Sequence, residues 1–291
     1  MKVNETQFPD GGNIYLEFPT IKILPLDKVI PHEYHDAQRT TPLVHSLQTS
    51  GVLISPPLFS PFDDSSGEYM VLDGANRVAA FKELGIPHIL GQVIPHNSPS
   101  LNLSTWNHVI CDMATSVLLK SLRVIPNAKL VEIKKANDRK HQDDDTPVSV
   151  QTPDDRKYRL VTTNEDIAAS VNILREVVNT YKEVARFDRI PLGNIDSIKG
   201  LYKDLTAIVC YPQFSIAEIF DLCRAGHLLP SGVTRFHISP RALRLYYPLD
   251  ELASSKSLED KNQTLNHWLQ ERVSSKSVRF YAEPTVVFDE L

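Results

Sequence analysis

The sequence lacks the features that would place the protein outside the ordinary globular class. Its three cysteines are an odd number without metal-type spacing, which argues against a disulfide framework and against a zinc site. No apolar run approaches the roughly 20 residues that cross a membrane, and the first residues form no apolar secretory signal. We therefore expect no membrane partner and a cytoplasmic location.

A large excess of charge of one sign is also missing. The net charge is −5 at pH 7, so no general field attracts nucleic acid, and a nucleic-acid partner would need a local basic patch. The composition, with 42% hydrophobic and 23% charged residues, is typical of a globular protein and excludes disorder of the whole chain. The length of 291 residues fits one large or two small domains.

A connector rich in proline, serine and asparagine at residues 95–102 divides the chain. Before it, the pattern predicts a strand, a loop, a helix, a hairpin, a second helix and a final strand. After it, helical and strand patterns mix. We therefore expect an α+β fold with two domains, at residues 1–98 and 99–291, and a ligand site in the cleft between them.

The second half contains a polar segment between two predicted strands. Residues 129–133 and 158–161 are expected to pair, and residues 134–157 between them, rich in Asp, Lys, Pro and Gln, are expected to form a mobile insertion. The apolar stretch that follows His108 predicts a helix to about Leu122.

Two helix starts can be predicted from their capping residues. Thr41 followed by Pro42 resembles an N-cap with proline in the first turn. Ser215 with Glu218 forms the capping-box pattern ahead of an apolar run.

The strongest chemical signal is an Asp-Gly pair between a strand and a helix. Residues 68–72 read as a strand, Asp73 and Gly74 follow, and Arg77 lies one turn into the helix. A helix start has unpaired N–H groups and a positive dipole end, so an anion site is one interpretation. A simply capped helix with a solvated arginine is the other, and the residues alone leave both open.

Three further segments offer polar groups. In the segment Gly232–His237, strand alternation places Arg235 and His237 on one face, where an arginine can hold a carboxylate or phosphate. The segment Ser104–His108 places a tryptophan and polar groups at the domain boundary. Glu33, in a loop after the first strands, can act as a general base if it faces the cleft. A structural role is the more common explanation for each of these segments when it is taken alone.

In this order, the four segments resemble the ParB/sulfiredoxin-like superfamily and, within it, the free L-serine kinases. The residues that carry the resemblance are His32-Glu33, Asp-Gly-Ala-Asn-Arg at 73–77, Ser-Thr-Trp-Asn-His at 104–108 and Gly-Val-Thr-Arg-Phe at 232–236. They are most similar to serine kinases of siderophore gene clusters. The resemblance implies phosphorylation of free L-serine to O-phospho-L-serine, a precursor of 2,3-diaminopropionate, with ATP or ADP as donor and Mg²⁺ as cofactor.

The resemblance also implies roles for individual residues. Glu33 matches the base that acts on the serine hydroxyl, and Asp73 matches a catalytic aspartate that also binds Mg²⁺. The nucleotide-phosphate loop matches Gly74, Ala75, Asn76 and Arg77. The expected substrate-binding residues are Ser104, Thr105, Trp106, His108, Thr234, Arg235 and His237, with Arg235 on the serine carboxylate.

One departure keeps alternatives open. The family motif usually has histidine where this chain has Asn76, which can donate a hydrogen bond but cannot carry a proton. A catalytically silent regulator that binds a nucleotide or an amino acid is therefore an alternative. A DNA-binding ParB-like protein would need a basic recognition helix, which we do not find. A sulfiredoxin-type reductase would need a cysteine within residues 73–77, where there is none.

Overall fold

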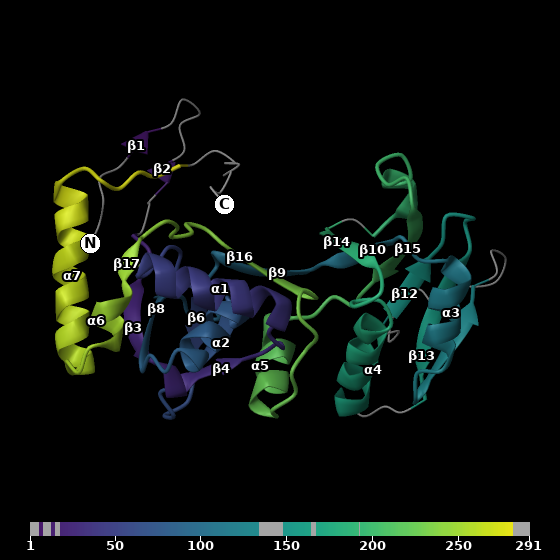
Figure 1. Ribbon diagram of the computed structural model, residues 1–291, viewed down its shortest axis with the longest axis horizontal. Coiled ribbons are helices and arrows are strands. Elements are labelled where there is room, and N and C mark those ends of the chain that lie inside the picture. The colour runs from purple at the N-terminus through teal and green to yellow at the C-terminus, as the bar shows by residue number, and fades with distance from the viewer. Residues whose placement is uncertain are drawn as a thin grey trace.

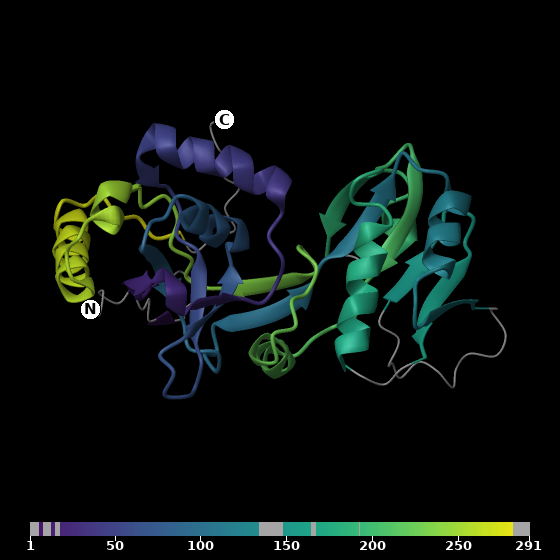
Figure 2. The same ribbon diagram turned by 60° about the horizontal axis from the view of Figure 1, so that its bottom comes forward.

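The computed structural model describes residues 6–7, 13–14, 18–133, 148–163, 167–191 and 193–281. It is elongated and has two lobes that are joined by a long β-ribbon (Figures 1 and 2). Helices and sheets occur in both lobes, so the expected α+β class is confirmed. The division at residues 98/99 stays a prediction.

The strands are short and number three to six residues in the two main sheets. In chain order they are β1 (Thr6–Gln7), β2 (Asn13–Ile14), β3 (Ile21–Pro25), β4 (Val29–Pro31), β5 (Val52–Leu53), β6 (Leu58–Pro61), β7 (Tyr69–Asp73), β8 (His88–Val93), β9 (Leu101–Thr105), β10 (Asn107–Cys111), β11 (Ala128–Glu132), β12 (Val148–Gln151), β13 (Lys157–Thr162), β14 (Arg186–Ile190), β15 (Leu205–Cys210), β16 (Thr234–Ile238) and β17 (Tyr247–Pro248).

The α-helices lie around these sheets. They are α1 (Ala37–Ser50), α2 (Ala75–Glu83), α3 (Thr115–Arg123), α4 (Ile167–Asn179), α5 (Ile216–Arg224), α6 (Leu249–Ala253) and α7 (Leu258–Ser274).

The first lobe is built on a five-stranded sheet in the order β3-β8-β6-β7-β4. Strands β6 and β7 form the expected antiparallel hairpin, whereas β4 and β7 are parallel. Asp73 is the last residue of β7, and α2 begins two residues later after Gly74, so the sheet fixes the position of the helix start. Helix α1 packs beside α2 (Figure 2).

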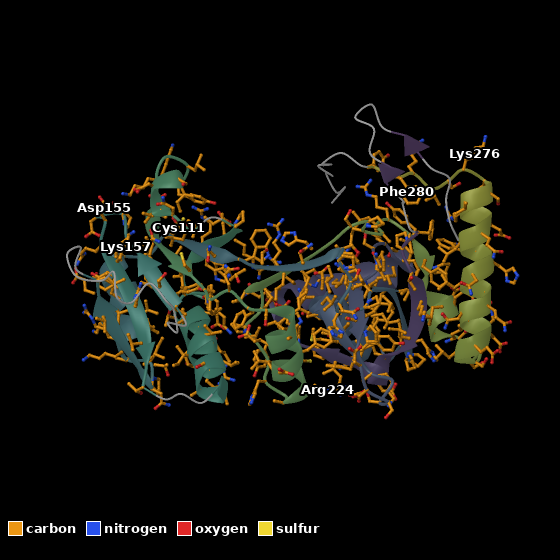
Figure 3. All side chains as sticks on the ribbon, turned by 180° about the vertical axis from the view of Figure 1, so that it is seen from behind. Cys111, Asp155, Lys157, Arg224, Lys276 and Phe280 are labelled. Atoms are coloured by element: carbon orange, nitrogen blue, oxygen red, sulfur yellow. The ribbon has the colours of Figure 1, made fainter. Side chains whose placement is uncertain are left out.

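The second lobe is built on a six-stranded sheet in the order β11-β13-β12-β15-β10-β14, with antiparallel pairing throughout. Helices α3 and α4 lie against it (Figure 1). Apolar side chains cover both faces of β10: Ile110 belongs to the larger core, and Val109 and Cys111 belong to a smaller core on the other face. Figure 3 shows Cys111 among these strands.

Strands β9 and β16 form the ribbon between the lobes. They are antiparallel, with Thr105 opposite Thr234 and Leu101 opposite Ile238. The two strands come from segments that are more than a hundred residues apart in the chain, so this pairing brings the sequence motifs at 104–108 and 232–237 together. Helix α5 lies beneath the ribbon (Figure 3), and its Arg224 forms ion pairs with Asp64 and Glu68.

The last helices return to the first lobe. Leu249, Leu252 and Leu265 belong to the same core as the strands of the first sheet. The Asn262 side chain accepts a hydrogen bond from the Ile23 N–H at 3.0 Å and donates to the Ile23 carbonyl at 2.9 Å. Helix α7 therefore covers the outer edge of β3, which lies at the end of the sheet.

The helix that was expected directly after His108 is wrong. Residues 107–111 form strand β10, and helix α3 begins only at Thr115. All five residues of β10 are buried. A strand that is covered on both faces reads as a continuous apolar run, which periodicity cannot distinguish from a buried helix. Cys111 is therefore a core residue of a strand.

The start of α1 also differs from the expectation. The helix begins at Ala37, where the Asp36 carboxylate accepts a hydrogen bond from the Gln38 N–H at 3.0 Å, and Pro42 lies inside the helix. The expected cap at Thr41 is thus wrong, because Asp36 supplies a cap one turn earlier. The predicted capping box of Ser215 and Glu218 is confirmed at α5.

Part of the polar segment at 134–157 lies within the described residues. Residues 148–151 form strand β12, which lies between β13 and β15 in the sheet. The side chains of Val148 and Val150 are buried, which explains why this part is a strand. The expectation of a mobile insertion is wrong for this part, and residues 134–147 lie outside the described residues. The predicted pairing of 129–133 with 158–161 is confirmed by β11 and β13.

None of the helices in the described part of the chain is long and apolar enough to cross a membrane.

Candidate functional site

The loop that carries Glu33 is fastened to the turn that precedes β16. The Tyr34 N–H donates to the Leu229 carbonyl at 2.9 Å, and the Leu229 N–H donates to the His32 carbonyl at 2.9 Å. The Glu33 carboxylate accepts a hydrogen bond from the Gly232 N–H at 3.0 Å. Two predicted motifs, His32-Glu33 and the segment from Gly232, therefore meet in space.

The environment of the Glu33 carboxylate favours its protonated form. Burial raises the pKa of Glu33, and this effect exceeds the lowering by His32, by the Gly232 N–H and by Arg189. The charge of Asp73 raises the pKa further, so the two carboxylates act on each other. A carboxyl group with a raised pKa holds a proton more firmly than a solvated glutamate, which suits a general base.

His32 ties this loop to both neighbouring strands. Its Nδ1 lies 2.5 Å from the Val71 carbonyl and its Nε2 lies 2.7 Å from Thr234 Oγ1. Because a carbonyl oxygen can only accept, Nδ1 donates to Val71, and Nε2 shares a hydrogen bond with the threonine hydroxyl. The Phe236 ring packs edge-on against the imidazole at 5.4 Å. Thr234 thus holds His32 in place, and the Thr234 hydroxyl already has a hydrogen-bond partner.

Asp73 lies between two arginines at the start of α2. Its Oδ2 accepts a hydrogen bond from Arg241 Nη2 at 2.6 Å, and Arg77 Nη2 lies 3.7 Å away. Burial raises the pKa of Asp73, but the charges of Arg77 and Arg241 lower it more, so the pKa lies below its usual value. Asp73 is therefore an anion at neutral pH, beside two cations.

Gly74 gives the start of α2 its shape. Its φ is +101°, and no side chain caps the helix. A Cβ atom at this position would lie 2.6 Å from Pro57 Cβ, so only glycine fits here without strain. The first N–H groups of α2 have no side-chain cap, and a helix start of this kind is suited to an anion.

Asn76 faces the start of α1. Its Oδ1 accepts a hydrogen bond from the Asp36 N–H at 2.7 Å. The amide oxygen is therefore occupied, and the amide NH₂ group is the part that can donate to a ligand. Ala75, its neighbour, is buried and lines the pocket described below.

The ribbon forms the wall next to Gly232. The Arg235 guanidinium lies over the Trp106 ring, 4.1 Å from its centroid, which is a cation–π contact. On the same face, Ser104 Oγ and His237 Nε2 form a hydrogen bond of 2.7 Å. The predicted alternation of β16 is confirmed, because Thr234 and Phe236 face His32 on the other side.

Three of the expected substrate-binding residues, Thr105, His108 and Thr234, are buried. His108 is fully buried, with Nε2 at 3.0 Å from the Gly232 carbonyl and Nδ1 at 2.7 Å from the Tyr181 hydroxyl. Burial lowers the pKa of His108 to about 4, so the ring is neutral at pH 7. Thr105 is also buried and donates to the Pro212 carbonyl at 2.8 Å. In this structure His108 acts on the site only by holding Gly232.

Arg189 and Arg241 are functional candidates that the sequence reasoning missed. Arg189 on β14 packs so closely on Gly232 that a Cβ atom there would clash with its guanidinium. Arg241 lies only six residues after Arg235, and the short spacing to the Gly-Val-Thr-Arg-Phe motif could have drawn attention to it. Nothing in the local sequence of Arg189 points to the site, because its position depends on the pairing of β14 with β10.

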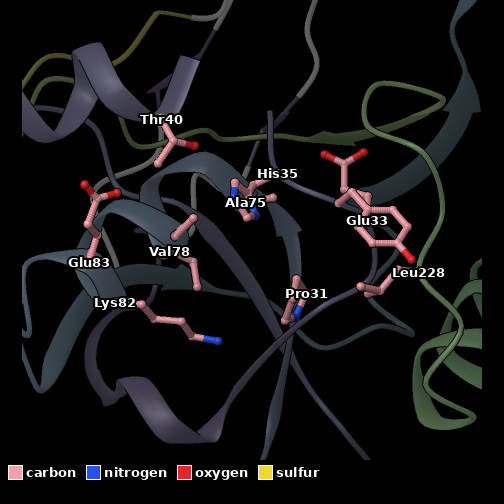
Figure 4. Close-up of a pocket in the computed structure, with 11 residues that line it drawn as sticks. Pro31, Glu33, His35, Thr40, Ala75, Val78, Lys82, Glu83 and Leu228 are labelled. Carbon is pink, nitrogen blue, oxygen red and sulfur yellow. The ribbon is translucent and has the colours of Figure 1, made fainter. Parts of the chain in front are cut away.

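A pocket of about 270 Å³ lies between the Glu33 loop and the face of α2 (Figure 4). Its floor is mostly apolar, with Pro31, Ala75 and Val78, and Lys82 and Glu83 lie at its edge. Glu33 and Leu228 border it on the other side (Figure 4). The pocket therefore connects the start of α2 with the Glu33 loop.

Within the described residues, no group of three His, Cys, Asp or Glu side chains could hold a metal ion. A magnesium site made of protein ligands alone is thus not found there. Mg²⁺ often binds to only one or two carboxylates together with substrate phosphates and water, and the Asp73 carboxylate suits that arrangement.

Comparison with solved structures defines the class of fold. The structure resembles SbnI with a C-terminal truncation from Staphylococcus aureus, with a TM-score of 0.70 and 23% identity over 87% of this chain and 97% of that one. It also resembles a free serine kinase in complex with AMP, with a TM-score of 0.66 and 16% identity over 81% of this chain and 95% of that one. The protein thus has the fold of the free serine kinases.

Comparison of sequences points to a particular relative. The chain is 25% identical over 251 residues to the ATP-dependent L-serine kinase SbnI of Staphylococcus aureus, which covers 86% of this chain and 89% of the relative. No protein-family model matches the chain. The resemblance to free serine kinases that the motifs indicate is therefore confirmed over most of the chain.

Proposed function

We propose that the protein is an ATP-dependent kinase that phosphorylates the hydroxyl of free L-serine. The observation that carries the proposal is the meeting of Glu33 with the Gly232 turn, next to Asp73 and the uncapped start of α2. Similarity to an ATP-dependent L-serine kinase over 86% of the chain supports it. The product is O-phospho-L-serine.

In this proposal Glu33 is the general base. The serine oxygen forms a bond to the terminal phosphorus of the donor as the bond to the leaving ADP breaks, and Glu33 accepts the hydroxyl proton. The Gly232 N–H holds the carboxylate in place. Phosphoryl transfer depends mainly on positioning and charge neutralisation, so the fixed loop matters as much as the basicity of the carboxylate.

The start of α2 would hold the donor phosphates. Gly74, Ala75 and Asn76 offer backbone N–H groups, the Asn76 amide can donate from its side chain, and Arg77 adds a cation. The adjoining pocket, with its apolar floor, has the character of a site for the nucleoside part of the donor. The site would then lie in the cleft between a ParB/sulfiredoxin-like first domain and the second lobe.

Mg²⁺ fits the same place. The Asp73 carboxylate is an anion with oxygen ligands beside the proposed phosphates, which is the donor set that Mg²⁺ prefers. When bound, the ion would neutralise charge on the donor phosphates. Asp73 would then exchange part of its contact with Arg241 for the ion.

The ribbon would form the serine pocket. Trp106 and Arg235, together with Ser104 and His237, provide half-buried side chains on its open face. Thr105 and His108 would act indirectly, through hydrogen bonds to the Pro212 and Gly232 carbonyls, and Thr234 through its hydrogen bond with His32.

The direct test is phosphorus NMR of the purified protein with L-serine, Mg²⁺ and either ATP or ADP. We expect O-phosphoserine with ATP, and no product when Mg²⁺ is removed by chelation. Absence of O-phosphoserine with both nucleotides would overturn the proposal. Nucleotide binding without product would instead favour a silent nucleotide-binding regulator.

A further inference from the structure

Arg189 contacts the same glycine that holds Glu33. The Gly232 N–H donates to Glu33 Oε2 at 3.0 Å, and the Arg189 guanidinium fills the space that a side chain at position 232 would need. Arg189 comes from β14 in the second lobe, and Glu33 comes from a loop of the first lobe. The two charged groups therefore approach one point from opposite lobes.

The Arg189 side chain has unused hydrogen-bonding capacity. Its Nε atom is buried and has no acceptor among the described residues, and no carboxylate there forms an ion pair with it. Burial lowers the pKa of Arg189, and the positive charge of Arg39 lowers it further, whereas Glu33 and Asp36 raise it. A buried guanidinium N–H group without an acceptor is costly, and a bound anion would offset that cost.

The size of serine limits which cation can bind its carboxylate. Only two carbon atoms separate the hydroxyl from the carboxyl carbon, so a serine whose hydroxyl faces Glu33 must place its carboxylate near the same turn. The charge of Arg189 acts on the Glu33 carboxyl, and its guanidinium packs on Gly232, which donates to that carboxylate. Arg235 instead lies over the Trp106 ring.

We propose that Arg189, and not Arg235, holds the carboxylate of the substrate serine. This inference rests on the proposed function and names the group that selects a free amino acid. A guanidinium can bind a carboxylate through two parallel hydrogen bonds. A serine inside a peptide, or a serine amide, has no negative charge at this end and would leave Arg189 unpaired.

The test compares L-serine with L-serinamide as substrates for the wild type and for Arg189→Gln. The wild type should prefer L-serine. Arg189→Gln should lower kcat/KM for L-serine by about 10–100-fold, because a hydrogen-bonded charge contact is lost. The same variant should leave kcat/KM for L-serinamide and the KM for ATP nearly unchanged. Arg189→Lys should lie between the two, because it keeps the charge but not the paired donors.

Two further variants serve as controls. Arg186 lies on the same strand, is half exposed and forms an ion pair with Asp112 at 3.1 Å, so Arg186→Gln should behave like the wild type. Arg235→Gln tests the competing residue and should keep the preference for L-serine over L-serinamide. Thermal unfolding and ATP binding establish that each variant is folded.

Three results would overturn the inference. Loss of the preference in Arg235→Gln, with the preference retained in Arg189→Gln, would assign the carboxylate to Arg235. An equal loss with both substrates in a folded Arg189→Gln protein would assign Arg189 to the phosphoryl group or to the fold. A wild type that forms no O-phosphoserine would remove the proposed function itself, and the inference with it.

Discussion

At the scale of single residues, the environment of Glu33 differs most from that of an ordinary surface glutamate. Its carboxylate is half-buried, receives one backbone hydrogen bond and lies within the influence of a second carboxylate, Asp73. Burial destabilises the charged form more than the hydrogen bond from the Gly232 N–H stabilises it, so the pKa of Glu33 rises. The same feature that makes Glu33 a better base makes its ionised form costly to the fold.

Glu33→Gln is therefore expected to lower activity and to raise stability, because glutamine carries no charge that burial would destabilise. Turnover should fall by about 10²–10⁴-fold, because the base is lost, while glutamine can still accept from the Gly232 N–H. ATP affinity should stay nearly unchanged in a binding titration. A parallel loss of ATP affinity and turnover would contradict the assignment and make Glu33 a structural residue.

The pH dependence follows from the same shift in the pKa of Glu33. The folded protein holds the Glu33 proton to a higher pH than the unfolded chain does, so stability decreases as pH rises from the ordinary glutamate value through the raised one. Activity should increase as pH rises over the same range, because only the ionised form of Glu33 accepts a proton. Denaturant unfolding and initial rates over the same pH range measure both slopes, and Glu33→Gln should flatten the first.

At the scale of elements, the start of α2 depends on one glycine. Gly74 combines a positive φ with close contact to Pro57, and both features exclude a side chain. The strand before it and the helix after it were predictable from periodicity and from the stop at Gly85, which has a φ of +65°. The close approach to Pro57 was not, because that residue belongs to the loop before β6.

Gly74→Ala should destabilise the protein and weaken nucleotide binding together. The strained backbone alone costs about 1–3 kcal/mol, and the contact with Pro57 would move the first turn of α2. Gly85→Ala is the matched control, because its φ is also positive but nothing lies within 4 Å of the added Cβ. It should cost about 1 kcal/mol and leave ATP affinity unchanged, as measured by urea unfolding and calorimetry. Equal ATP affinity in both variants would contradict a phosphate site at α2.

At the scale of the whole molecule, the C-terminal helices complete the first lobe. Leu265 of α7 is fully buried in the core of the first sheet, and Asn262 satisfies the backbone of edge strand β3. The buried Lys261 donates to the Leu252 carbonyl at 2.7 Å and so ties α7 to α6. The first lobe therefore depends on residues from both ends of the chain.

Leu265→Ala should lower the free energy of unfolding by about 2–5 kcal/mol, because it leaves a cavity in that core. Gln270→Ala, at an exposed position of the same helix, should change it by less than about 0.5 kcal/mol. Urea unfolding of both variants measures the difference. A small effect of Leu265→Ala would show that α7 contributes little to the first lobe.

The two lobes meet through few side chains near the proposed site. Arg175 of α4 donates to the Tyr34 hydroxyl at 3.1 Å, and Arg189 packs on Gly232. His108, Tyr181 and Tyr211 form a buried chain of hydrogen bonds behind Gly232. The position of Glu33 is thus set by groups in both lobes.

By itself, the sequence determined those features that depend on neighbours along the chain. The hairpin before Asp73, the glycine at the start of α2, the capping box at Ser215 and the alternation of β16 all follow from local backbone and side-chain preferences. Local preference failed at residues 107–111, because a strand buried on both faces has no alternation to read. It also failed at residues 148–151, where the neighbours in the sheet make a strand of a polar segment.

Only the tertiary structure decided which charged groups share one place. The contacts of Glu33 with Gly232, of Asp73 with Arg241 and of Arg189 with Gly232 join residues that are far apart in the chain. The physical reason is that burial and electrostatic interactions act through space, so the pKa of a carboxylate and the partner of a guanidinium depend on strand pairing and lobe packing that no local pattern records.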